Sequence, residues 1–193
     1  MTGRQLSKIK LIITIILIVI GSYSIYDWPP RLDHIMQFAQ SNQPGLYNVA
    51  RFVDGDTIVV SMQGKAETVR FIGIDTPETH KPNTPVQCYG PAAAAYTKNI
   101  IGSHLVRLES DILSANRDRY DRLLRYVYLD NGTFVNKELV QRGYAFYYPY
   151  FPFSKAQEFK DAQTSAQQQF LGLWGNCHPI KKGAGYVSNT AAS

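Results

Sequence analysis

The stretch YNVARFVDGDTIVVSMQGKAETVRFIGI, residues 47–74, holds three short runs of strand-forming residues and the two turns that join them. The runs Tyr47–Val53, Thr57–Met62 and Thr68–Ile74 are each rich in Val, Ile, Phe or Thr, which favour β-strands. Asp54-Gly55 and Gln63-Gly64 lie between the runs, and both dipeptides are typical of tight turns. The stretch therefore predicts three successive strands of a sheet.

The residues beyond this stretch predict two further strands and three helices. The strands are expected at 104–110 and 123–129, and the helices at 92–101, 136–141 and 154–170. Pro91 suits the first turn of a helix, Asn136 is a good N-cap, and Ser154 with Gln157 forms a capping box. The pattern is mainly β with α, and it predicts a small curled sheet. A five-stranded OB-type barrel and an open α+β sheet both fit it.

The N-terminal segment predicts contact with a membrane. Residues 1–10 carry three basic residues, and residues 11–20 are apolar except for Thr14. A bilayer span needs about 20 mainly apolar residues, and residues 11–26 supply 16. We therefore expect a transmembrane anchor at 11–26 behind a basic cytoplasmic segment at 1–10, with a cleaved signal peptide as the alternative. Either reading places the following domain outside the cytoplasm, on the cell membrane or secreted.

The rest of the chain divides into a linker, one domain and a tail. Residues 27–45 contain Pro29-Pro30 and read as a linker, residues 46–178 as the domain, and residues 179–193 as a flexible tail. Of the formal net charge of +5, the first 43 residues hold four basic and two acidic side chains, which leaves +3 for the remainder. This balance is compatible with a polyanionic substrate but is weak support for one.

The two cysteines, Cys88 and Cys177, both lie beyond the N-terminal segment. An even count in an exported domain predicts a disulfide, and their spacing fits no metal site. Two unpaired thiols are the alternative.

Three polar clusters carry the candidate chemistry. They are the turn 54–57, the strand residue Arg70 with the turn 75–78, and the charged run 117–122. Taken alone, the first is an ordinary turn and the third a solvated loop. Arg70 lies in an apolar run and needs an acidic partner if it faces inward, and Pro77 holds the second turn at a strand end.

Taken together, the clusters supply what phosphodiester hydrolysis requires. Asp56, Asp75 and the Thr76 carbonyl offer hard oxygen ligands that suit Ca²⁺. Two arginines suit phosphate, because a guanidinium donates planar, two-pronged hydrogen bonds. Glu78 is a further carboxylate that can act on water.

The order of these motifs resembles the staphylococcal nuclease (thermonuclease) family. Asp-Gly-Asp-Thr at 54–57, Arg70, Asp-Thr-Pro-Glu at 75–78 and Asp-x-Tyr-x-Arg at 118–122 follow one another as in that family. Tyr89-Gly90-Pro91, Val135-Asn136 and Leu139-Val140 extend the resemblance, which spans roughly residues 46–174. It implies an OB barrel capped by three helices, and an endo- and exonuclease on DNA and RNA that leaves 3′-phosphate ends.

The resemblance also assigns roles to residues. Asp56 and Asp75 would bind Ca²⁺ through their carboxylates and Thr76 through its carbonyl, with Asp54 just outside these ligands. In the same way, Arg70 and Arg122 would hold the phosphate and stabilise the transition state, and Glu78 would act on the attacking water, a role that is argued over in the family. Asp118 and Tyr120 stand at matching positions, with Tyr120 near the nucleotide.

Two departures from the family pattern concern substrate binding. The family often has glycine where Asp121 stands, and a carboxylate there either repels phosphate or faces solvent. The family's tyrosine-bearing stretch does not align residue by residue. The aromatic run 144–151 holds several base-stacking candidates, of which Tyr148 and Tyr150 are selected. The alternative, favoured for any single one of these residues, is a place in the barrel or helix core. Lys81 is the one clearly basic residue of the substrate loop 79–86.

The sequence thus predicts a calcium-dependent nuclease outside the cytoplasm, with DNA and RNA as substrates and no obligate protein partner. One alternative is a catalytically inactive nucleic-acid-binding OB module on the membrane. A second is a membrane-anchored interaction domain that uses the aromatic stretch 146–153.

Overall fold

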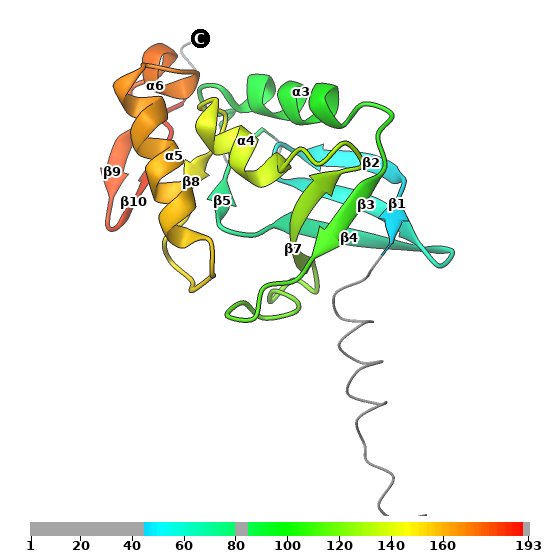
Figure 1. Ribbon diagram of the computed structural model, residues 1–193. Coiled ribbons are helices and arrows are strands. Elements are labelled where there is room, and N and C mark those ends of the chain that lie inside the picture. Colours follow the sequence, from blue (N-terminus) through cyan, green and yellow to red (C-terminus); the bar gives the residue numbers. More distant parts are fainter. Residues whose placement is uncertain (1–44, 80–84, 191–193) are drawn as a thin grey trace, which may run out of the picture. The chain divides into compact units, whose positions relative to one another are not determined.

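A computed structural model describes residues 45–79 and 85–190 of this chain (Figure 1). The predicted membrane segment, most of the predicted linker and Lys81 lie outside the described residues. Among the described residues, no helix is both long and apolar enough to cross a bilayer.

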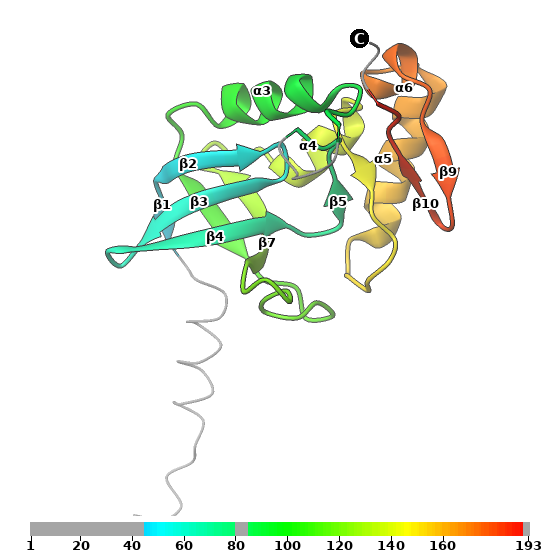
Figure 2. The same cartoon turned by 180° about the vertical axis from the view of Figure 1, so that it is seen from behind.

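The main sheet has six labelled strands in the order β1-β6-β7-β4-β3-β2. Their bounds are β1 Leu46–Tyr47, β2 Val49–Asp54, β3 Thr57–Met62, β4 Lys65–Phe71, β6 Val106–Glu109 and β7 Leu123–Leu129. Figure 2 shows β2, β3 and β4 side by side, as their antiparallel registers require. β4 and β7 run parallel, with Arg70 opposite Leu124.

The sheet closes on itself through its first strand. β1 and β2 are separated only by Asn48, yet β1 pairs with β6 and β2 pairs with β3. The register between β2 and β3 shifts twice, between Val49 and Arg51 and again between Phe52 and Asp54. Such irregularities bend a strand and increase its twist, which is how a small sheet curls into a barrel.

Buried aliphatic and aromatic side chains fill the space between the sheet and the helices. Ile58, Val69, Leu108 and Val127 come from four different strands, and none is more than 1% exposed. Alternate residues of a strand point to opposite faces, so these positions direct one face of each strand inward. This core fixes the strand register on which the polar turns depend.

Among the described residues, three helices have seven or more residues: α3 Gly90–Ile101, α4 Val135–Gln141 and α5 Ala156–Gln168. α3 begins with Pro91 in its first turn, and Gly102 follows its last residue with a φ of 50°. α4 packs against both β7 and α5. The four-residue helix α6, Leu173–Asn176, and two small sheets complete the domain, as Figure 1 shows. The small sheets pair β5 Ile74–Asp75 with β8 Phe146–Tyr147, and β9 Ile180–Lys182 with β10 Gly185–Val187.

Most sequence predictions for this part of the chain are confirmed. The domain is mainly strands with helices, the strands at 57–62 and 123–129 have the predicted bounds, and the Cys88–Cys177 disulfide is present with its Cα atoms 6.0 Å apart.

Both predicted helix caps are wrong. The α5 N-cap is Lys155, and the hydroxyl of Ser154 donates to Asp111 instead of to the helix. Asn136 lies inside α4, where its side chain is buried and bonds the backbones of β7 and of Ile72. In each case a tertiary partner outcompetes the local backbone donor.

The predicted flexible tail from residue 179 is also incorrect where the structure describes it. β9 and β10 form a hairpin, and Thr190 bridges to Gln87. These strands are only three residues long and contain glycine and lysine, so the sequence has no hydrophobic periodicity that would predict them.

Candidate active site

The turn between β2 and β3 packs directly on the turn that follows β5. A Cβ atom on Gly55 would lie 2.9 Å from the Thr76 side chain, so the two turns approach too closely for any larger residue. Asp54 Oδ1 accepts hydrogen bonds from the Gly55 amide and the Thr79 hydroxyl, each over 2.9 Å. From α3, the Thr97 hydroxyl donates to the Gly55 carbonyl over 2.6 Å. The Asp-Gly-Asp-Thr turn is therefore fixed from both sides.

Asp56 and Asp75 converge on one guanidinium group. Arg70 pairs with Thr57 across the β3–β4 ladder, which places its side chain beside the turn. It forms an ion pair with Asp56 and donates from Nη2 to Asp75 Oδ1 over 2.8 Å. Asp56 Oδ2 also accepts the Thr76 amide over 2.8 Å. The acidic partners that the sequence requires for an inward Arg70 are thus present.

Burial makes this carboxylate cluster energetically costly. It raises the pKa of Asp75 to about 6, although the charge of Arg70 acts in the opposite direction. Burial likewise raises the pKa of Asp54 to about 6, with hydrogen bonds to Glu78 and the charge of Asp56 adding to the effect. Burial acts to lower the pKa of Arg70, but the charges of Asp56 and Asp75 outweigh this effect, so the net result is a raised pKa. Carboxylates forced together in this way favour a bound cation.

Glu78 lies at the edge of the same cluster. Its amide donates to Gln87 Oε1 over 2.7 Å, and Glu78 Oε1 accepts the Thr79 amide over 3.2 Å. The hydrogen bond to Asp54 that raises the Asp54 pKa shows that Glu78 and Asp54 are in contact. The predicted water-activating residue is thus beside the predicted metal ligands.

Arg122 reaches the site from the loop that precedes β7. Asp118 fixes it, because Arg122 Nε donates to Asp118 Oδ2 over 2.7 Å and Nη2 lies 2.6 Å from the same oxygen. Burial raises the pKa of Asp118, but hydrogen bonds from Arg122 and Tyr120 outweigh it and the pKa is lowered. Asp118 therefore stays ionised and orients Arg122.

Asp121 faces solvent. Its side chain is 88% exposed, and its carboxylate lies 3.6 Å from Arg117. Its backbone has a φ of 64°, in the left-handed region that glycine adopts without strain. This conformation explains why glycine suits the position, and aspartate is among the residues that tolerate it.

A cleft of about 670 Å³ joins the two arginines. Among the described residues that line it are four arginines and one aspartate: Arg70, Arg117, Arg119, Arg122 and Asp118. Tyr120 and Tyr148 also line it, together with Leu113 and Phe151. Tyr120 is 64% exposed, and its ring lies under the guanidinium of Arg119 at 4.7 Å. The cleft thus combines positive charge with exposed aromatic surface, which suits a nucleic-acid strand.

Tyr150 is placed differently from Tyr148. It is not among the described residues that line the cleft, and its hydroxyl donates to the carbonyl of Lys182 in β9. Its ring packs beside that of Tyr148, with ring centroids 4.9 Å apart. Tyr150 therefore packs against Tyr148 and supports its ring.

The chemistry of the predicted metal ligands fits a hard cation. Within the described residues no group of three or more His, Cys, Asp or Glu side chains forms a metal cluster. The predicted set is different, since it has two carboxylates and one backbone carbonyl. Asp56 and Asp75 both form ion pairs with the guanidinium of Arg70. The buried Thr76 hydroxyl next to them has no hydrogen-bond partner. Oxygen donors of this kind suit Ca²⁺.

Several residues that build the site are not signalled by the sequence. Thr79, Gln87 and Thr97 hold the two turns together, and Leu113 and Phe151 widen the cleft. Each is a common residue type in a loop or helix. Their roles depend on contacts between segments far apart in the chain.

Comparison with known proteins places this geometry in a family. The profile described as "Staphylococcal nuclease homologue" matches residues 68–176, which include Arg70, Asp75, Glu78 and Arg122. The chain belongs to the staphylococcal nuclease family. Asp56 precedes the matched range, so its place in the site rests on the contacts with Arg70 and Thr76.

Relatives in this family are similar over most of the domain. The chain is 46% identical to a thermonuclease of Staphylococcus hyicus over 131 residues, which are 67% of this chain and 76% of the relative. It is 45% identical to a thermonuclease of Staphylococcus intermedius over 129 residues, 66% of this chain and 75% of the relative. It is 41% identical to endonuclease YncB of Bacillus subtilis (strain 168) over 152 residues, 77% of this chain and 68% of the relative.

Proposed function

We propose that this chain is a calcium-dependent endonuclease that hydrolyses phosphodiester bonds of DNA and RNA and leaves 3′-phosphate ends. The observation that carries the proposal is the position of Arg70, which forms ion pairs with Asp56 and Asp75 and also lines one cleft with Arg122. Family membership and the names of the relatives support the reaction class. β1 pairs with β6 and the adjoining β2 pairs with β3, and this closed path of strands supports an OB-type barrel with three capping helices.

Each part of the site has a task in this reaction. Asp56, Asp75 and the Thr76 carbonyl would hold Ca²⁺, which supplies positive charge to a phosphate oxygen. Arg70 and Arg122 donate to the other phosphate oxygens and stabilise the charge that builds in the transition state. Glu78 accepts a proton from the attacking water. For a 3′-phosphate product, the bond that breaks is the one between phosphorus and the 5′-oxygen.

The alternative, an inactive binding module, fits the site less well. A protein that only binds nucleic acid needs the arginines and the aromatic surface but has no use for buried carboxylates. Burial raises the pKa values of Asp54 and Asp75 to about 6, so these groups destabilise the fold when they are ionised. A catalytic metal site gives a physical reason to retain them.

The deciding test is turnover by the unmutated protein with calcium and with a chelator. We expect Glu78→Gln and Arg122→Ala each to lower kcat by about 10² or more with smaller effects on KM, because both groups act mainly in the transition state. Arg142→Ala is the matched control, since this arginine is the C-cap of α4 and is not among the described residues that line the cleft. Binding of nucleic acid without hydrolysis, and no effect of Glu78→Gln, would establish the binding module instead.

The calcium assignment has its own test. Asp56→Asn removes one negative charge from the metal ligands while both arginines remain. We expect the calcium concentration for half-maximal activity to rise by about tenfold or more, with turnover at saturating calcium less affected. An unchanged calcium requirement would show that Asp56 is not a ligand.

We also propose that the domain works outside the cytoplasm, attached to the membrane or secreted. The basic and apolar order of residues 1–26 supports export. The Cys88–Cys177 disulfide supports an oxidising compartment.

A further inference from the structure

One residue, Gln87, holds the backbone of Glu78 on both sides. The Gln87 amide donates to the Glu78 carbonyl over 2.9 Å, and the Glu78 amide donates to Gln87 Oε1 over 2.7 Å. Two hydrogen bonds to a single partner fix the orientation of the peptide groups on either side of Glu78. They therefore fix the direction in which its side chain leaves the backbone.

The start of α3 supports the same point of the chain. A Cβ atom on Gly90 would lie 2.8 Å from the Glu78 carbonyl oxygen, so the helix packs directly on this turn. Glu78 thus has two supports, the start of α3 and Gln87. The loss of one support displaces the carboxylate without releasing it completely.

Gln87 and Cys88 are in turn held by the last described residues of the chain. Thr190 forms an antiparallel bridge with Gln87. The Cys88 amide donates to the Asn189 carbonyl over 2.8 Å, and the Ser188 hydroxyl donates to the Cys88 carbonyl over 2.8 Å. Residues 188–190 therefore run alongside the segment that holds Glu78 and bond to its backbone.

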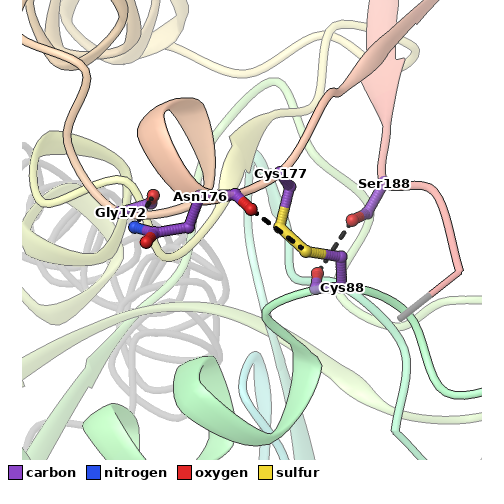
Figure 3. Close-up of a disulfide and its surroundings, with 5 residues drawn as sticks. All are labelled: Cys88, Gly172, Asn176, Cys177 and Ser188. Atoms are coloured by element: carbon purple, nitrogen blue, oxygen red, sulfur yellow. Dashed lines mark hydrogen bonds between the residues drawn. A yellow bond between two sulfur atoms is a disulfide. The ribbon is translucent and has the colours of Figure 1, made fainter. Parts of the chain in front are cut away.

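The disulfide fastens this arrangement to the rest of the domain. Figure 3 shows Cys88 joined to Cys177 directly after α6, with Ser188 on the other side of Cys88. Cys177 is 4% exposed and belongs to a small apolar cluster with Phe146 and Leu173. The residue next to Gln87 is thus bonded covalently to the buried Cys177, directly after α6.

We propose that residues 188–190 and the Cys88–Cys177 disulfide form a clamp that positions Glu78 through Gln87, so that turnover depends on the disulfide. The proposal rests on the proposed nuclease function. Gln87 is a positioning residue in this scheme, since it contacts Glu78 and acts on the reaction through it. None of the arginines that bind phosphate is held by the clamp.

The expected effect follows from geometry. Misplacement of a reacting group by about 1 Å can lower a rate by about 10². The start of α3 still supports Glu78 when the clamp is opened, so we expect kcat to fall between about 10-fold and 100-fold. Affinity for nucleic acid depends on the arginine cleft, so KM should change less than about threefold.

The test uses the full chain and two variants. Cys88→Ser with Cys177→Ser opens the clamp, and Gln87→Met removes only the acceptor for the Glu78 amide. Both should lower kcat on single-stranded DNA with little change in KM. Gln87→Glu keeps an acceptor at that position and should restore kcat to within about threefold of the unmutated protein. Unchanged kcat in both folded variants would overturn the proposal.

A control separates positioning from general loss of stability. Val106 is buried and lies opposite Leu129, at the end of β7 that is remote from Arg122. Val106→Ala leaves a cavity in the core. It should lower the melting temperature and leave kcat unchanged when measured well below that temperature. Equal losses of kcat in this variant and in the clamp variants would also overturn the proposal.

Reduction provides an independent measurement. A dithiol transfers two electrons and two protons to the disulfide, which gives two cysteine thiols and the oxidised cyclic dithiol. Activity of the unmutated protein should fall to that of the double serine variant, and the variant itself should not respond. Faster amide hydrogen exchange at Glu78 and Gln87 should accompany reduction.

Failure of the clamp and failure of the proposed function give different results. If the unmutated protein hydrolyses nothing with calcium present, the nuclease assignment fails and the dependence of turnover on the disulfide fails with it. Hydrogen exchange then still reports on the contact itself. Unaltered protection of Glu78 and Gln87 after reduction would show that no clamp exists.

Discussion

Asp54 shows how a single residue sets both the chemistry and the stability of the site. Burial is the largest influence on its carboxyl group, and its neighbours Glu78 and Asp56 are acidic. An aspartate in the Asp-Gly turn is read from the sequence as an ordinary turn residue. Its pKa is raised first by burial and then by the hydrogen bond to Glu78, which is 24 positions away in the chain, so the sequence alone does not reveal the shift.

The stability of the calcium-free protein should depend on pH through this group. The pKa of Asp54 is about 6 in the folded protein against 3.8 as the reference value. The folded state therefore binds more protons between these values, and stability falls as pH rises from about 4 to 6. We expect Asp54→Asn to raise the melting temperature by a few degrees at pH 7.5, and to give no gain at pH 4.

Calorimetry with a chelator present would measure this difference. Asp121→Asn is the matched control, because its carboxylate is 88% exposed and should show no such gain. An equal gain for Asp54→Asn at both pH values would mean that the effect is not electrostatic.

The candidate catalytic residues are the part of the site that the sequence predicted best. All five lie within 23 consecutive positions, with Arg70 in β4 between the two turns, so their local order already carries much of the geometry: Asp56, Arg70, Asp75, Thr76 and Glu78. Arg122 is more distant in the chain, but it is the last residue of the Asp-x-Tyr-x-Arg motif at 118–122. The structure brings all six to one region, through contacts that connect Arg70 to Asp56 and Asp75 and through the cleft that Arg70 shares with Arg122.

At the scale of elements, two loops form the rim of the cleft. Asp111 accepts the Tyr126 hydroxyl over 2.6 Å and the Ser154 amide over 2.8 Å, and the Ser114 hydroxyl donates to the Pro152 carbonyl over 3.2 Å. These bonds tie the loop after β6 to the loop before α5. The connection leaves Leu113 and Phe151 exposed along one cleft.

This rim should contribute to substrate binding. Phe151 is 69% exposed, and its ring centroid lies 6.1 Å from that of Tyr148. Stacking of a base on an aromatic ring contributes about 1–3 kcal/mol, so Phe151→Ala should raise KM for single-stranded DNA by about 5-fold to 100-fold with little change in kcat.

Phe170→Ala provides the comparison. This ring is 74% exposed but is not among the described residues that line the cleft. Steady-state kinetics on a single-stranded oligonucleotide would measure KM for both variants and for the unmutated protein. The same KM in all three would refute a stacking role for Phe151.

The elements themselves were predictable where the pattern of residues is strong. β3 and β7 have the expected bounds because each is a run of strand-forming residues that ends at a turn. The caps of α4 and α5 were not predictable, since Asn136 and Ser154 bond to distant segments instead of to their own helices. The parallel pairing of β4 with β7 also has no local signal, because 51 residues separate these strands.

At the scale of the whole chain, the domain should lie on the outer side of the membrane. The basic residues of segment 1–10 favour the cytoplasmic side, and the disulfide favours an oxidising environment. Protease added to intact cells should therefore degrade the domain, or the domain should be found in the medium. Immunoblotting of cells and medium would measure this. A domain that stays protected inside cells and is absent from the medium would contradict the prediction.

The closure of the sheet through β1 and β2 has a consequence for aggregation. Unpaired strand edges invite pairing with other chains, and closed barrels remove them. In the main sheet β1 pairs with β6 and the adjoining β2 pairs with β3, so the short strand β9 is a more accessible edge in the described domain. There the exposed Ile180 is followed by Lys181 and Lys182, whose charges repel a second copy of the same edge. Electrostatic repulsion at one hairpin thus complements the hydrogen-bonded closure of the main sheet in keeping the molecules apart, and high salt would weaken only the repulsion.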